Sequence, residues 1–231
     1  MSDLPVKKPR APRAKKKAAG RFHHGALREA VLATSTALLE REGVEALTLR
    51  RLAAMHGVSE PALYRHFASK DALLAAVGLR GLERFSEEQV RALTAAPTPA
   101  AAVLAGGRAY LRFAVANPGW FRLWFSRRWT DEIDQGSLNA QVFVIGQASR
   151  QALRGAIAAL LRRPVPPADV FDDAVDDAFR ACWGLCHGLA FLVLDRAFRL
   201  VNTDEQRLAY ADRALVTFVN ALAATSSPSS S

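Results

Sequence analysis

Residues 48–67 read TLRRLAAMHGVSEPALYRHF, and this stretch decides the fold of the N-terminal part of the chain. Thr48 precedes a two-turn apolar run that ends at Gly57. Ser59 then precedes a second run with Pro61 in its first turn. Hydroxyl residues are favoured as helix N-caps, and proline is tolerated where helical N–H groups have no partner. The stretch therefore predicts two short helices joined by a glycine turn, which is the spacing of a helix-turn-helix.

The two predicted helices pack through apolar residues and leave one face of the second helix outside. The packing set is Leu49, Leu52, Ala53, Val58, Leu63 and Phe67, and the outer face carries Glu60, Pro61, Ala62, Tyr64, Arg65 and His66. In DNA-binding proteins such a face enters a major groove. Short helix pairs joined by glycine also occur in many bundles, so the pattern alone indicates DNA binding only weakly.

The rest of the chain has the period of helices, and we expect an all-α fold with about nine helices. One amphipathic helix runs from His24 to the glycine at 43, and another follows the Ser69 cap to about Leu93. Beyond the Pro-Thr-Pro break at 97–99 the pattern predicts helices over about 100–116, 120–125, 130–162 and 169–199. A capping box of Thr203 and Gln206 begins the last helix, which ends near Ala223.

Four strings in order resemble the signature of TetR-type (TetR/AcrR) transcriptional regulators: TLRRLA at 48–53, GVS at 57–59, ALYRHF at 62–67 and SKDALL at 69–74. The resemblance covers about fifty residues from His24 onward. It implies a homodimeric DNA-binding regulator, by default a repressor, in which a small molecule releases the operator.

Composition and the resemblance together predict the domain organisation. We expect a disordered basic arm over 1–22, a three-helix helix-turn-helix DNA-binding domain over 23–77, a helical effector-binding and dimerisation domain over 78–225, and a disordered tail over 226–231.

Residue by residue, the resemblance assigns contacts with double-stranded DNA. Thr48, Tyr64, His66 and Lys70 would hold phosphates, and Arg50, Glu60, Pro61, Ala62 and Arg65 would lie nearest the base edges, with Ser59 in the same interface. Most residues of the second group are short or apolar. Sequence readout is therefore expected to use few hydrogen bonds, with thymine-methyl contacts and DNA shape contributing.

Charge is concentrated at the N-terminus. Eight basic residues against the single acid Asp3 give the segment before Phe22 a charge of +7, out of +9 for the whole chain. Its prolines and its lack of apolar periodicity indicate disorder. The arm is either a solubilising tail or a flexible cation that follows phosphates or enters a minor groove. Because it ends beside the predicted DNA-binding domain, we favour the second reading.

The later part of the chain is rich in large aromatic residues. A cluster of Trp, His and Gly residues there resembles one branch of the family. We expect an effector pocket for a hydrophobic or aromatic molecule, lined by Trp120, Phe121, Trp124, Phe125, Phe179, Trp183 and His187. Trp129 belongs to the same cluster, and the alternative is that all these rings are simply core.

The last two long helices carry small and apolar residues suited to close helix approach. The family pairs its final helices across a two-fold axis, so we expect a dimer and a pseudo-palindromic operator. Residues considered for this contact are Gly184, Gly188, Ala190, Ala214, Val216, Val219 and Ala223.

Other function classes find little support. No phosphate loop, nucleophile elbow or paired catalytic carboxylates are evident, so we expect that the protein is not an enzyme. An effector-independent architectural DNA-binding protein is the main alternative, followed by an activator.

We expect no cofactor and no metal. Cys182 and Cys186 are interpreted as buried hydrophobes rather than as a sensor with His187. Asp172, Asp173, Asp176 and Asp177 are interpreted as a solvated helix face. The apolar run 185–194 is too short to span a bilayer, and no signal peptide is evident, so we expect a cytoplasmic protein.

Overall fold

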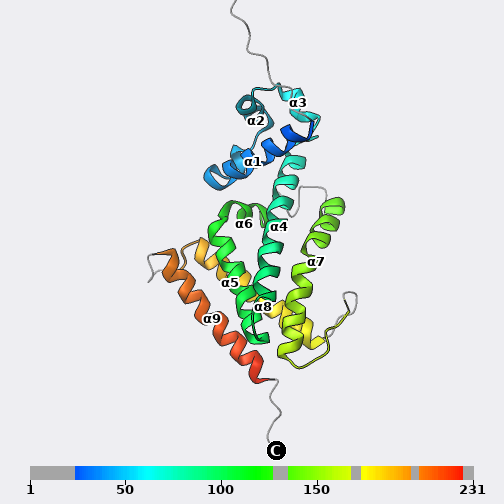
Figure 1. Ribbon diagram of the computed structural model, residues 1–231. Helices are drawn as coiled ribbons and strands as arrows, with labels where there is room; N and C mark the ends of the chain where they lie inside the picture. Colours follow the sequence, from blue (N-terminus) through cyan, green and yellow to red (C-terminus); the bar gives the residue numbers. More distant parts are fainter. Residues whose placement is uncertain (1–23, 127–134, 168–172, 199–202, 226–231) are drawn as a thin grey trace, which may run out of the picture.

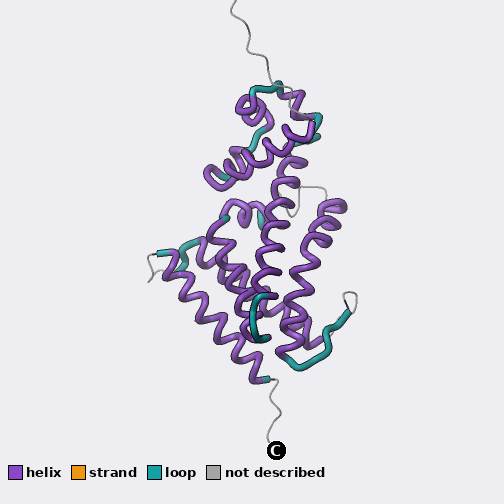
Figure 2. Tube along the Cα trace, in the orientation of Figure 1, coloured by secondary structure: helices purple, strands orange, loops and turns teal. Residues whose placement is uncertain are grey.

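The computed structural model describes residues 24–126, 135–167, 173–198 and 203–225. Within these ranges the chain forms nine α-helices and one 3-10 helix and contains no strand, which confirms the predicted all-α fold (Figure 2). The predicted arm, the predicted tail and Trp129 lie outside the described residues.

A small N-terminal head lies at one end of the molecule (Figure 1). It consists of α1 (His24–Glu42), η1 (Val44–Ala46), α2 (Leu49–His56), α3 (Glu60–Tyr64) and the beginning of α4 (Lys70–Thr94). Its core is made by apolar side chains that α1 to α4 bury against each other, among them Val31, Leu52, Leu63 and Leu74.

The larger body contains α5 (Pro99–Ala116), α6 (Pro118–Trp124), α7 (Gln135–Leu160), α8 (Asp173–Leu194) and α9 (Asp204–Ala224). The central helix α5 contacts α4, α7, α8 and α9. The predicted first residues of α7 and α8, Thr130 and Asp169, lie outside the described residues.

The helix α3 lacks the capping bond that is typical of a hydroxyl N-cap, and it ends before Phe67, the last residue of the stretch predicted to form the two short helices. Ser59 occupies the N-cap position, but its hydroxyl makes no capping hydrogen bond. Pro61 has no N–H to offer, and the Ala62 N–H is already bonded to the Ser59 carbonyl at 2.9 Å. The helix also ends at Tyr64, because the N–H groups of His66 and Phe67 both turn back to the Leu63 carbonyl.

The helix α4 joins head and body without a break. The Ser69 hydroxyl accepts from the Ala72 N–H at 3.1 Å, which caps its first turn as predicted. The helix then runs for 25 residues along the length of the molecule (Figure 1). The domain boundary predicted after residue 77 therefore falls inside one continuous helix.

One expectation about the body is wrong. Asp176 was placed on a solvated helix face, but it is buried and accepts two hydrogen bonds from the Arg154 guanidinium, at 2.9 and 3.2 Å. The reason is that α7 packs on this face of α8 and supplies the arginine that the carboxylate needs once it is removed from water. Asp177 is exposed and pairs with Arg180.

The helix α8 is long and apolar. Residues 174–194 are long and apolar enough, by length and composition, to cross a membrane. In the fold this helix contacts α5, α7 and α9 and carries the buried Asp176 ion pair. Its buried residues include Cys182 and Cys186, which are unbridged parts of the hydrophobic core.

Candidate DNA interface and effector cavity

The head has the geometry of a helix-turn-helix. The Thr48 hydroxyl accepts from the Arg51 N–H at 3.2 Å, which starts α2. Gly57 ends α2 in the left-handed conformation, with φ of 65°, which a glycine adopts without strain. The Val58 N–H then bonds to the Ala53 carbonyl and turns the chain into α3.

All ten residues predicted to contact DNA lie on the accessible surface of the head. Thr48, Arg50, Ser59, Pro61, Tyr64 and Arg65 are exposed, and Glu60, Ala62, His66 and Lys70 are half-buried. The Tyr64 side chain is 50% exposed although it is large and aromatic. Met55, on α2, is 51% exposed and was not predicted, because a methionine in an apolar-periodic helix gives no signal for an outward position.

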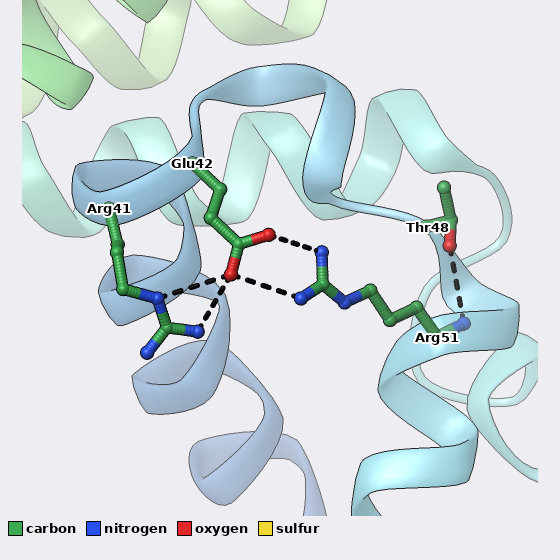
Figure 3. A network of polar contacts seen from close by, with 4 residues as sticks. All are labelled: Arg41, Glu42, Thr48 and Arg51. Carbon is green, nitrogen blue, oxygen red and sulfur yellow. Dashed lines mark hydrogen bonds and ion pairs between the residues drawn. The ribbon is translucent and has the colours of Figure 1, made fainter.

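An ionic network fixes α2 against α1 (Figure 3). The Glu42 carboxylate accepts from the Arg51 guanidinium at 2.7 and 3.0 Å and from Arg41 at 2.8 and 3.1 Å. These hydrogen bonds, Arg51 first, lower the pKa of Glu42 from 4.5 to about 2. Arg51 is therefore held by α1, whereas its neighbour Arg50 points to solvent.

Lys70, at the first turn of α4, makes one ion pair. Its Nζ lies 3.5 Å from the exposed Glu45 carboxylate. An exposed pair of this length is weak and screened by salt, so it leaves the lysine available to an incoming phosphate.

The body contains a cavity of about 390 Å³ between α4, α5, α6, α7 and α8. Five of the seven residues predicted for the pocket line it: Phe121, Trp124, Phe125, Phe179 and Trp183. Phe85 and Tyr110 add to its aromatic wall, with ring centroids 5.3 Å apart and edge-to-face.

The two other predicted residues lie behind this wall. Trp120 is buried and stacks on Phe113, with centroids 5.9 Å apart. It also fills the space beside Gly81, where an added Cβ would lie 2.6 Å from the indole. His187 packs edge-on to Phe125 at 4.3 Å, and its Nδ1 lies 3.2 Å from the Tyr110 hydroxyl. Burial lowers the pKa of His187 and raises that of Tyr110.

Polar groups in the cavity wall were missed by the sequence analysis. Gln89 of α4 and Ser149 and Arg150 of α7 line it among the rings. Each lies on a long helix that also has exposed polar positions, so helical period alone does not separate a polar residue at a cavity from one in solvent.

The cavity wall is connected to the head through α6. The Glu40 carboxylate, near the end of α1, accepts from the N–H groups of Gly119 and Trp120 at 2.9 and 3.1 Å. These are N–H groups of the first turn of α6, which have no partner within the helix. At the other end of α6, the Trp124 indole donates to the Gly78 carbonyl of α4 at 2.9 Å.

Models of known protein families match both the head and the body of the chain. A family model described as bacterial regulatory proteins, tetR family, matches residues 31–77. A second, described as a tetracyclin repressor-like C-terminal domain, matches residues 103–218. The resemblance to the branch with the Trp, His and Gly cluster stays a prediction, because neither description names it.

Individual relatives agree with these matches. The tetracycline repressor protein class C of Escherichia coli is 56% identical over 50 residues, which is 22% of this chain and 23% of that protein. The uncharacterized HTH-type transcriptional regulator YobS of Bacillus subtilis is 27% identical over 97 residues, 42% of this chain and 50% of that protein. The chain thus matches half or less of the length of these two relatives.

A solved structure of a protein of unknown function from Rhodococcus sp. RHA1 aligns over most of both chains. It covers 88% of this chain and 99% of its own, with a TM-score of 0.68 and 28% identity. Together with the helix-turn-helix geometry and the all-helical body, these matches identify the chain as a member of the TetR family of bacterial transcriptional regulators, which are DNA-binding proteins and not enzymes.

Proposed function

We propose that this regulator is a ligand-responsive repressor, which binds a pseudo-palindromic operator as a homodimer and is released by a small hydrophobic effector. The observation that carries the proposal is the position of the cavity. Its walls include α4, which enters the head, and α6, which Glu40 binds to the head. A molecule that enters the cavity therefore contacts the two helices on which the placement of the head depends.

On the DNA side, the outer face of α3 enters the major groove in this proposal. Tyr64, Thr48 and Lys70 hold phosphates around it, and the last of these acts from the N-terminus of a long helix, where the dipole favours an anion. Arg50 and Arg65 are the exposed long cations next to the groove. Since Pro61 and Ala62 have no side-chain donor, base recognition there uses apolar contact and DNA shape.

The dimer interface in this proposal is made by α8 and α9. A stripe of exposed small and apolar residues follows one side of α8: Ala181, Gly184, Gly188 and Leu192. An added Cβ at Gly184 or Gly188 would meet nothing within 4 Å, so another helix can approach there closely. Ala190 and Val219 were also considered for this contact, but they are buried inside the protomer and belong to its own core.

Effector action in this proposal is a change in the separation of the two heads. Phe121, Trp124 and Phe125 form the cavity side of α6. An effector that displaces them moves the α6 N-terminus, which is bonded to Glu40 of α1, and so tilts the head. Two recognition helices fit successive major grooves only at one spacing, so a tilted pair loses the operator.

The test begins with selection of the operator from fragments of the source genome by the purified protein. A pseudo-palindromic site bound by two protomers, and released by a hydrophobic molecule that also protects the protein against heat, supports the proposal. Specific binding that no hydrophobic molecule disturbs favours the effector-independent alternative. A fall in transcription from the site when the regulator is removed from the cell indicates an activator.

A further inference from the structure

We propose that the effector carries a single carboxylate on an apolar body and that Arg150 of α7 binds this carboxylate in the cavity. The inference rests on the proposed function, which requires a small effector but does not fix its charge.

Arg150 differs from two other arginines of the body, which are both paired with carboxylates. Among the described residues that line the cavity it is the single charged one. Arg154, one turn later, is bound by Asp176, and Arg108 of α5 is bound by Asp212 at 2.6 and 2.9 Å. Arg150 has no carboxylate within 4 Å in the described part of the chain, where it donates to the Phe143 carbonyl and lies 4.5 Å over the Phe143 ring.

The guanidinium is placed at the cavity wall by a glycine. Gly146, one turn before Arg150, also lines the cavity, and an added Cβ there would lie 2.6 Å from Nη1 of Arg150. Glycine inside a helix costs about 1 kcal/mol relative to alanine. Here the missing side chain is the space that the guanidinium occupies, so the positive charge lies at the rim of an aromatic chamber.

This environment selects a particular ligand chemistry. A partly buried cation without a counter-charge gains from an anion, and burial already lowers the pKa of Arg150. The guanidinium fork matches a carboxylate with two parallel hydrogen bonds. One positive charge balances a monoanion rather than a phosphate dianion, and the rings of Phe85, Phe121 and Trp124 accommodate an apolar body. A cavity of about 390 Å³ is at the small end of the range for ligand sites, which indicates a compact molecule.

The experiment measures binding of matched probes to the full-length protein at neutral pH. Octanoate and 4-phenylbutyrate are the carboxylates, 1-octanol and 4-phenylbutan-1-ol are their uncharged counterparts, and octylamine is the cation. Quenching of tryptophan fluorescence reports occupancy, because Trp124 and Trp183 line the cavity, and equilibrium dialysis checks it. We expect the carboxylates to bind about tenfold or more tightly than the alcohols, and octylamine to bind weakest.

Three variants and one control test the role of the charge. Arg150→Gln should remove the preference for carboxylates and leave the affinity for alcohols unchanged, while Arg150→Lys should retain part of it. Gly146→Ala keeps the charge and strengthens the helix but displaces the guanidinium, so it should reduce the same preference without loss of thermal stability. Arg112→Gln, which removes an exposed charge on α5, is the matched control and should bind every probe as the parent does.

Equal affinity for alcohols and carboxylates, carboxylate binding that survives Arg150→Gln, or no carboxylate binding at all would overturn the inference. Operator release is measured with the same probes, which separates the two proposals. Carboxylates that bind through Arg150 but leave the operator occupied contradict the effector-responsive repressor and support the carboxylate site. Release of the operator by the alcohols alone supports the effector-responsive repressor and contradicts the carboxylate site.

Discussion

Glu40 gives a direct test of how the head is joined to the body. Its carboxylate is the partner of two N–H groups in the first turn of α6, at 2.9 and 3.1 Å. Glu40→Ala leaves both groups without this acceptor, and Glu40→Gln keeps one uncharged acceptor oxygen. If the contact holds α1 to α6, both variants should be less stable than the parent, and alanine should cost more than glutamine.

The magnitude follows from the kind of bond that is lost. Loss of an N-terminal cap costs about 1 kcal/mol, and the charge adds about 0.3–1 kcal/mol through the helix dipole. We therefore expect the free energy of unfolding to fall by about 2 kcal/mol in Glu40→Ala and by about 1 kcal/mol in Glu40→Gln. In a chain of this size 1 kcal/mol shifts Tm by about 2–4 °C, which gives a loss of about 4–8 °C and about 2–4 °C.

The assay is thermal unfolding at one fixed protein concentration, because the Tm of a protein that dimerises, as proposed above, depends on concentration. Glu29→Ala is the control on the same helix. Glu29 pairs with Arg80 at 2.8 Å on the exposed surface, where such pairs contribute below about 1 kcal/mol. If Glu40→Ala melts within 1 °C of Glu29→Ala, the Glu40 contact does not join head to body, and the coupling through α6 must be abandoned.

The remaining predictions concern other contacts. Arg154→Met should lower the free energy of unfolding by about 3–5 kcal/mol, because it leaves the Asp176 charge buried alone. In denaturant unfolding, the double variant with Asp176→Leu should recover most of this loss. Equal losses for the single and the double variant would contradict the prediction. Glu42 has a pKa lowered from 4.5 to about 2, so its contribution to stability is complete above pH 4.5 and disappears as the pH falls toward 2. Carbon-detected NMR titration should show that Arg51→Gln raises the pKa of Glu42, and an unmoved titration would place the cause elsewhere. Deletion of residues 2–20 should weaken operator binding and reduce the log–log salt slope by about 0.9 for each lost phosphate contact; an unchanged slope would show that the arm does not contact DNA.

Local chemistry in the sequence was sufficient for the head. The Thr48 cap, the left-handed Gly57 and the Ser69 cap each depend on residues within one turn, and all three have the predicted role. Ser59 occupies the predicted position without the predicted bond, because proline removes the N–H at the second helical position. In α3, therefore, the prediction missed the cap hydrogen bond at one end and the early stop at Tyr64 at the other.

The body was less accessible to this reasoning, since its contacts join residues far apart in sequence. Nothing near Asp176 indicates that α7 supplies Arg154, 22 positions earlier. Trp120 and Phe121 are neighbours on one short helix, yet one packs on Gly81 and the other faces the cavity. Composition indicated an aromatic cluster, but which ring faces the cavity depends on how α6 packs against α4 and α5, far away in the sequence.

The unbroken α4 helix has a consequence for how such a protein can change over time. A helix turns by about 100° and advances about 1.5 Å with each residue, so one residue inserted between Ser86 and the head would swing the recognition surface about a quarter-turn around the body. Insertions of seven residues come within about 20° of the original orientation. A different body can therefore be recombined with the DNA-binding head, and keep the orientation of the recognition surface, only if the junction in α4 preserves the helical phase.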